Sequence, residues 1–185
     1  NRIIYDAFNP DARTLYWQQA SAGLFRHGID AWWCDCSEPF EADWHGAIKP
    51  EPFERAAENI AEARKYLDPG KINLYSLYHS MGIYEGQRGE NSGKRVLNLT
   101  RSSYAGQHRY GTFTWSGDVS SRWEVLRRQV PEGLNYCATG ECYWTTDAGG
   151  FFPQQWDGAW FGMGEFNNGV DDPGYRELYV RWLQL

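Results

Sequence analysis

The order of sequence patterns along this chain predicts an α/β fold with a parallel sheet. Helical and strand-like segments alternate through the 185 residues, and no internal repeat, linker or second domain interrupts them. Such alternation is typical of parallel sheets, which place their chemistry at the carboxyl ends of the strands. A polar residue follows four of the strand-like segments here: Asp35, Arg101, Asp118 and Asp147.

The first half of the chain begins with a helix that leads into a strand. Asn9-Pro10 supplies an N-cap residue and a proline at the first helical position. Apolar residues then recur at helical spacing until Gly28, and the apolar run 29–34 predicts a buried strand that ends at Asp35. Beyond it the patterns predict a loop over 37–52, helices over 53–67 and 74–84, and a polar, glycine-containing loop over 85–94.

The second half repeats the alternation. Strands are predicted over 95–100 and 111–115, followed by a helix over 121–130 that Pro131-Glu132-Gly133 should break. A strand over 142–146 and a long loop over 150–170 come next. Asp172-Pro173 then opens a last helix.

The polar strand ends favour a (β/α)8 barrel, because the pocket of that fold forms at the carboxyl ends of its strands. A closed barrel needs eight strands and typically about 250 residues, whereas this chain supplies about four strands. We therefore expect residues 1–185 to form a partial barrel domain that comes from the middle and late part of the fold.

Charge and hydropathy exclude several classes of partner. The net charge is −6 with a pI near 5.2 and no basic run, which argues against nucleic acid. No apolar stretch approaches the roughly 20 residues of a membrane span. The chain starts at Asn1, without an initiator Met or a signal peptide, and we expect it to begin in mid-sequence.

Four cysteines, at positions 34, 36, 137 and 142, are expected to be buried thiols. Cys34 and Cys36 would point to the same face of a strand, where a disulfide between them would be strained. No Cys/His cluster has the spacing of a zinc site. Unpaired thiols favour a reducing compartment such as the cytoplasm.

Two carboxylates carry the functional prediction. Asp35 and Asp118 each follow a run that contains tryptophan, and the chain holds ten tryptophans in all. Paired carboxylates beside aromatic rings indicate cleavage of a carbohydrate. The alternatives are structural: Asp35 could end a strand in a turn, and Asp118 could be the N-cap of the helix from Ser121.

The motifs resemble those of glycoside hydrolase family 31, the α-glucosidases and α-xylosidases. Residues 32–39, Trp-Trp-Cys-Asp-Cys-Ser-Glu-Pro, are similar to the family's nucleophile signature, and residues 99–118 to the segment that ends in its acid/base. Residues 143–151 and 176–182 resemble a further core motif and the helix after it. The resemblance implies strands four to seven of the barrel, with the remainder of the barrel supplied by the parent chain.

The same resemblance implies a retaining α-glycosidase that removes terminal α-linked glucose or xylose from oligosaccharides. Asp35 would be the nucleophile and Asp118 the acid/base, with no metal or organic cofactor. Arg101 would contact a sugar hydroxyl or form a salt bridge, and Asp147 would contact the sugar or brace its neighbours. Further candidates for sugar contact, each of which could instead be core, are Trp33, Trp115, Trp144 and Phe151.

Two other interpretations stay open from the sequence. Because the barrel is incomplete, the chain could be an inert fragment or a carbohydrate-binding protein. A transglycosylase or an α-glucan lyase would share both acids and differ only in how the glycosyl-enzyme is resolved. Glu38 is expected to hold its loop rather than to take part in the chemistry.

Overall fold

The computed structural model describes residues 4–39, 52–91, 93–155 and 163–185. It divides the chain into two compact units, Asn1–Thr114 (unit 1) and Trp115–Leu185 (unit 2). The boundary falls within a strand, where the sequence has no linker signal. Most of the predicted loop over 37–52 lies outside the described residues.

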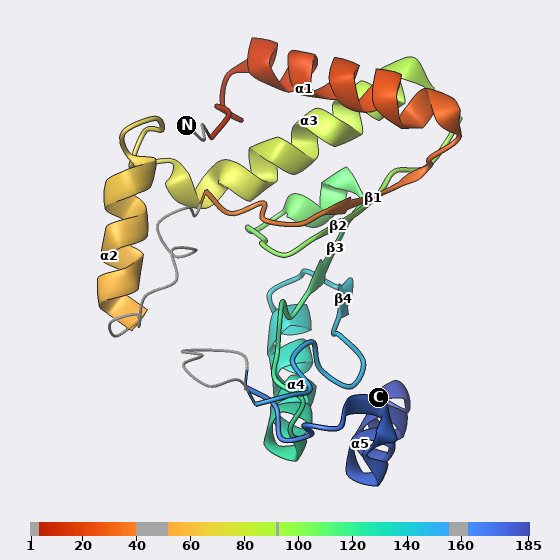
Figure 1. Ribbon diagram of the computed structural model, residues 1–185. Coiled ribbons are helices and arrows are strands. Elements are labelled where there is room, and N and C mark those ends of the chain that lie inside the picture. The colour runs from red at the N-terminus through yellow and green to blue at the C-terminus, as the bar shows by residue number, and fades with distance from the viewer. Residues whose placement is uncertain (1–3, 40–51, 92, 156–162) are drawn as a thin grey trace. The chain divides into compact units, whose positions relative to one another are not determined.

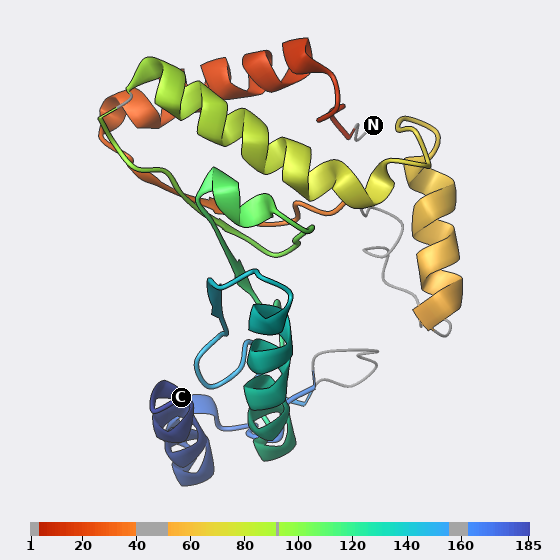
Figure 2. The same cartoon turned by 180° about the vertical axis from the view of Figure 1, so that it is seen from behind.

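Two helices of unit 1, α1 (Pro10–Gly23) and α3 (Tyr75–Glu90), lie side by side over the strands β1 (Ala31–Cys34) and β2 (Leu97–Thr100) (Figure 1, Figure 2). The predicted cap of α1 is confirmed, because the Asn9 side chain accepts a hydrogen bond of 2.9 Å from the Asp11 amide. A short 3-10 turn follows α1 and ends at Gly28, whose φ of 97° is readily adopted only by glycine.

The core of unit 1 forms where α1 and α3 meet β1. Trp17 of α1, Trp32 of β1 and Ile83 of α3 are all buried. Gly86 allows the close approach of the two helices, since a Cβ atom there would lie 2.2 Å from the Trp17 ring. Alternate residues of β1 are buried, so Trp32 faces the helices while Trp33 lies on the opposite, open face.

The strands β1, β2 and β3 (Thr112–Trp115) pair in parallel, as predicted. The hydrogen-bonded order is β1-β2-β3-β4, with β4 at Trp144–Thr145. Trp33 is in register with Leu99, and Leu99 with Phe113. Because Cys34 pairs with Thr100, the next residues, Asp35 and Arg101, emerge together at one edge of the sheet.

Helix α3 is longer than the sequence predicts. It continues to Glu90, into the region over 85–94 that was expected to be a loop. Helix α2 (Pro52–Ala63), which precedes it in the chain, also lies in unit 1. The continuation is stabilised by tertiary contacts, which override the weak helix propensity of glycine. Gln87 is fully buried in this last part of the helix, where it accepts a 2.7 Å hydrogen bond from the Trp32 indole.

Unit 2 contains β4 with helices α4 (Trp123–Ala138) and α5 (Pro173–Leu183). The expected break at Pro131 is wrong, because α4 runs through this proline. Apolar side chains lie at helical spacing on both sides of it, at Val130, Leu134 and Cys137, and line a common cavity. The proline removes only one hydrogen bond from this 16-residue helix. The predicted cap of α5 is confirmed, since the Asp172 side chain accepts from the Gly174 amide at 2.8 Å.

The cysteine prediction is correct in one part and wrong in another. All four thiols are free, but only Cys34 is buried, and burial raises its pKa to about 12. Cys36, Cys137 and Cys142 are exposed. Strand β1 ends at Cys34 and Cys36 has a φ of 52°, so its thiol does not follow the alternation of the strand.

Among the helices that the structure describes, none combines the length and apolarity that a membrane span requires. Within the same residues, no three His, Cys, Asp or Glu side chains are grouped as ligands for a metal ion.

Candidate active site

In unit 1, three of the charged residues of interest, Asp35, Glu38 and Arg101, lie at the ends of β1 and β2. The Arg101 guanidinium makes two hydrogen bonds to the Glu38 carboxylate, of 3.0 Å through Nε and 3.2 Å through Nη2. Its Nη1 lies 3.2 Å from Asp35 Oδ1. Of the two roles expected for Arg101, the salt bridge is present, and Glu38 is its closer partner. Contact of Arg101 with a sugar hydroxyl stays a prediction.

The three charged side chains differ in exposure. The Asp35 side chain is 43% exposed, against 15% for Arg101 and 10% for Glu38. Arg101 and Glu38 therefore form an inner ion pair, and Asp35 is the carboxylate that a ligand can reach. Burial alone would lower the pKa of Arg101, but its hydrogen bonds to Glu38 and the charges of Glu38 and Asp35 hold this pKa above its ordinary value.

Cys36 orients the Asp35 carboxylate through its backbone. Its left-handed conformation is uncommon for a residue other than glycine and costs roughly 1–2 kcal/mol. The Cys36 amide donates a 2.7 Å hydrogen bond to Asp35 Oδ1, the same oxygen that faces Arg101. The Cys36 thiol accepts a hydrogen bond from Arg101 Nη2 at 3.3 Å, and its partial desolvation raises its pKa.

A set of polar side chains, all buried except the half-buried Ser102, lies beside these residues in unit 1. It comprises Ser37, Ser76, Ser80, Thr100, Ser102 and Gln107, and we refer to it as the serine–glutamine cluster. Sequence reasoning missed these residues, because they come from segments far apart in the sequence and no linear pattern shows that they meet.

In unit 2, the segments that carry Asp118 and Asp147 are joined by backbone hydrogen bonds. Asp118 follows β3 after Gly117, and Asp147 follows β4. The Ser116 amide donates to the Thr145 carbonyl at 3.1 Å, and the Phe151 amide donates to the Val119 carbonyl at 2.8 Å. The segments that carry the two aspartates therefore lie side by side within unit 2.

Gly150 is needed for this arrangement of the two segments. Its amide donates to the Asp147 carbonyl at 2.9 Å, which closes a turn. Its φ of 83° suits glycine, and a Cβ atom there would lie 2.7 Å from the Ser121 backbone. Any larger residue would push the Asp147 turn away from the segment that carries Asp118.

The structure excludes one structural role considered for Asp118, that of the N-cap residue of the following helix. Helix α4 begins at Trp123 with Arg122 in the N-cap position, four residues beyond Asp118. Asp118 is therefore not the cap of this helix.

The four aromatic candidates fall into two groups. Trp33 is 70% exposed and Phe151 is 54% exposed, so both rings are available to a ligand. Trp115 is buried, and the Trp144 ring packs on Gly133 of α4, where a Cβ atom would lie 2.9 Å from it. Sugar contact stays a prediction for all four.

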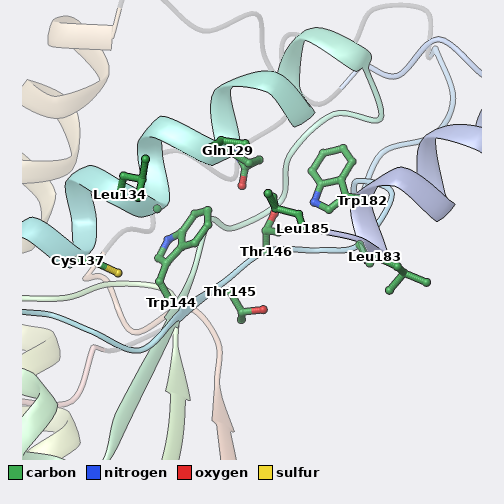
Figure 3. Close-up of a pocket in the computed structure, with 12 residues that line it drawn as sticks. Gln129, Leu134, Cys137, Trp144, Thr145, Thr146, Trp182, Leu183 and Leu185 are labelled. Atoms are coloured by element: carbon green, nitrogen blue, oxygen red, sulfur yellow. The ribbon is translucent and has the colours of Figure 1, made fainter.

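A cavity of about 470 Å³ lies in unit 2 between α4, β4 and α5 (Figure 3). Its lining is mostly apolar and includes the rings of Trp144 and Trp182. Gln129 Oε1 and Trp182 Nε1 line it without a hydrogen-bond partner in the described part of the chain. Among the described residues that line this cavity, none is Asp or Glu.

Comparison with known proteins agrees with these features. The family model "Glycosyl hydrolases family 31 TIM-barrel domain" matches residues 1–185. The chain is 39% identical over 181 residues to an α-xylosidase of Saccharolobus solfataricus, covering 96% of this chain and 22% of the relative. It is 37% identical to α-xylosidase A of Aspergillus niger, covering 97% of this chain and 25% of the relative.

A solved structure gives the same result. The family 31 α-xylosidase Xac1773 of Xanthomonas citri matches with a TM-score of 0.75 and 34% identity, over 98% of this chain and 18% of that protein. The chain thus spans about a quarter or less of each of these three relatives. The parallel strands, the acids at their ends and the match over residues 1–185 agree: the chain belongs to glycoside hydrolase family 31.

Proposed function

We propose that this chain is the central to late part of a (β/α)8 catalytic barrel in a larger protein, a retaining α-glycosidase. Its substrate is an oligosaccharide with a terminal α-linked xylose or glucose. The observation that carries the proposal is the position of Asp35, a half-exposed carboxylate at the end of a strand. Its Oδ1 accepts a hydrogen bond from the Cys36 amide and faces Arg101.

The reaction would proceed by double displacement. Asp35 attacks the anomeric carbon while Asp118 donates a proton to the leaving oxygen, so the glycosidic bond breaks and a glycosyl ester forms on Asp35. Asp118, now ionised, takes a proton from water. The resulting hydroxide attacks the anomeric carbon and releases the sugar and the Asp35 carboxylate. Two inversions give net retention.

The charges of unit 1 suit the role of nucleophile. A nucleophilic carboxylate must be ionised, and a permanently charged guanidinium 3.2 Å away favours that state. The inner pair with Glu38 keeps Arg101 in place, so that the cation does not depend on a substrate for its position. Rigid support of this kind is what efficient catalysis requires.

The relatives favour α-xylosides as the first substrates to test. Those at 34–39% identity are named α-xylosidases, whereas neutral α-glucosidase C of Homo sapiens is 29% identical. The experiment is hydrolysis of p-nitrophenyl α-xyloside and α-glucoside by the full-length protein and by its Asp35→Ala and Asp118→Ala variants. Loss of activity in both variants is expected.

Azide separates the roles of the two acids. In Asp35→Ala, azide can take the place of the missing carboxylate and should give a β-glycosyl azide. In Asp118→Ala, azide attacks the glycosyl ester on Asp35 and should give an α-glycosyl azide. Nuclear magnetic resonance of the products distinguishes the two anomers, and the reverse assignment would refute the proposed roles.

Product analysis separates the competing functions. Free sugar with the α configuration indicates a hydrolase, a new oligosaccharide a transglycosylase, and an unsaturated product a lyase. Binding of oligosaccharide without turnover by the full-length wild type would favour the carbohydrate-binding alternative.

A further inference from the structure

We propose that Gln107 is a positioning residue for catalysis: its buried amide ties the segments that carry Asp35 and Arg101 to helix α3. The inference rests on the proposed function, since it concerns how the nucleophile of that reaction is held. The hydrogen bonds of the Gln107 amide go to Ser76, Ser80, Ser102 and Tyr104, so it would act through the serine–glutamine cluster.

Gln107 occupies the centre of that cluster. It begins a 3-10 helix, Gln107–Tyr110, and its side chain is fully buried. Its Nε2 group donates to the hydroxyls of Ser76 at 2.7 Å and Ser80 at 3.1 Å, both on α3, and to the Ser102 carbonyl at 3.1 Å. Its Oε1 accepts from the Tyr104 amide at 3.0 Å. One amide thus joins α3 to the loop after β2.

Ser102 is the link from this amide to the catalytic segments. It directly follows Arg101, and its carbonyl also accepts a 2.6 Å hydrogen bond from the Ser76 hydroxyl. The Ser102 hydroxyl donates to the Ser37 carbonyl at 3.3 Å and lies 3.2 Å from the Ser37 hydroxyl. Ser37 is two residues beyond Asp35 and directly precedes Glu38, so one chain of contacts reaches both segments.

The physical consequence follows from burial. Within a low-dielectric interior, a fully bonded polar network is rigid, and removal of one member leaves its partners without hydrogen bonds. Without the Gln107 amide, the Ser102 carbonyl would lose a donor and the Tyr104 amide an acceptor. Arg101 would then lose part of its backbone support, and a displacement of about 1 Å at a reacting group can cost about 10²-fold in rate.

The cluster offers a matched pair of test variants. Ser76 and Ser80 are buried serines one turn apart on α3, and both accept from Gln107. Ser76 also donates to the Ser102 carbonyl, whereas the one hydrogen bond of the Ser80 hydroxyl within the described part of the chain comes from Gln107. Ser76→Ala should therefore disturb the catalytic segments more than Ser80→Ala, although the chemical change is the same.

The experiment measures covalent labelling of Asp35 by an activated 2-deoxy-2-fluoro-α-glycoside in the full-length protein. Mass spectrometry gives the rate constant and the final fraction labelled for the wild type, Gln107→Met, Ser76→Ala and Ser80→Ala. We expect rate constants lower by about 10²-fold for Gln107→Met and about 10-fold for Ser76→Ala, and within about 2-fold of wild type for Ser80→Ala. All four proteins should reach full labelling.

Each alternative outcome decides the matter. A merely structural role would lower the fraction labelled through loss of folded protein and leave the rate constant unchanged, which overturns the inference. Ile83→Val, a destabilising change elsewhere on α3, provides that pattern for comparison. A wild-type rate in Gln107→Met, or equal slowing in Ser76→Ala and Ser80→Ala, also overturns it. An unlabelled wild type would refute the proposed function itself, and this inference with it.

Discussion

The candidate catalytic residues of unit 1 and those of unit 2 are held by different forces. In unit 1, side chains do most of the holding: an arginine joins two carboxylates, and buried serines and a glutamine lie beside them. In unit 2, the segments that carry Asp118 and Asp147 are joined through backbone amides, with glycine at the point of closest approach. The residues of unit 1 are thus sensitive to charge and hydrogen-bonding chemistry, and those of unit 2 to backbone conformation.

This difference agrees with the tasks that we propose for the two acids. A nucleophile must stay ionised and be held in one orientation, which a fixed cation provides. An acid/base must exchange a proton at each turnover, so its carboxylate has to keep its position in both protonation states. Backbone hydrogen bonds hold the segments that carry Asp118 and Asp147 in place.

The largest expected effect is in unit 1, on removal of Arg101. Arg101→Met leaves Glu38, with its side chain only 10% exposed, without the arginine that pairs with it. A buried charge that loses its partner typically costs about 3–5 kcal/mol, so the free energy of unfolding should fall by about that amount. Catalytic rate should also fall, because Asp35 loses its cation. Urea unfolding and the hydrolysis assay measure the two effects.

The double variant Arg101→Met/Glu38→Met sharpens this test. Removing both members of a buried pair can leave stability almost unchanged, so the double variant should regain most of the lost stability. Activity should not return, since the cation beside Asp35 is still missing. If activity returns with stability, Arg101 serves only the fold.

A second effect, expected in unit 1 alone, depends on pH. His79 of α3 is buried against Tyr5 and Tyr16 of the N-terminal region and Tyr75 of its own helix, and the Tyr5 hydroxyl lies 2.7 Å from its Nδ1. Burial lowers the pKa of His79 from 6.5 to about 4. Between these values the unfolded chain binds a proton that the folded chain does not, so stability falls as the pH falls.

The sign and size of this effect are measurable. The His79 contribution is complete above about pH 6.5 and is lost progressively toward pH 4, by on the order of 3 kcal/mol. Hydrogen exchange should show the loss in the amides of unit 1, around α1 and α3. His79→Phe should remove this part of the pH dependence, and an unchanged slope in that variant would contradict the assignment.

Much of the fold was predictable because local signals and tertiary packing agree. The caps Asn9 and Asp172 and the parallel strands were read correctly. The errors fall where packing overrides propensity. Helix α3 continues past Tyr84, where Gln87 is buried against Trp32. Helix α4 continues through Pro131, with apolar side chains at helical spacing on both sides of the proline.

Some residues of the candidate site were predictable from the sequence and others were not. An acid after an apolar run identifies Asp35, and strand register then explains why Arg101 lies next to it. The left-handed conformation of Cys36 and the partners of Gln107 have no counterpart in a linear pattern, since both depend on contacts between segments distant in sequence. The exposure of Cys36, Cys137 and Cys142 was also missed, because the burial of a thiol depends on such contacts.

The backbone support in unit 2 is tested by a pair of glycines. Gly150→Ala places a Cβ atom 2.7 Å from the Ser121 backbone, whereas Gly140, with a similar φ of 92°, has no atom within 4 Å of that position. Both variants carry the conformational penalty of roughly 1–2 kcal/mol, but only Gly150→Ala also carries a clash of about 1–3 kcal/mol. We expect lower activity in Gly150→Ala alone. Equal activity in the two variants would contradict the conclusion that backbone conformation positions the candidate residues of unit 2.

The smallest expected effect on activity comes from changes in the core of unit 1, which should alter stability and leave the catalytic rate unchanged. In Gly86→Ala the new Cβ atom would meet the Trp17 ring at 2.2 Å, so α1 and α3 must move apart at a cost of about 1–3 kcal/mol. Gly89→Ala, on the same helix, meets nothing within 4 Å and should stabilise by about 0.5–1 kcal/mol. Thermal unfolding measures both changes. The added Cβ atom meets Trp17 in one variant and no atom in the other, so the rate per folded molecule should match wild type in both. A lower rate in Gly86→Ala would show that the distance between α1 and α3 reaches the nucleophile, and that charge and hydrogen bonding alone do not hold it.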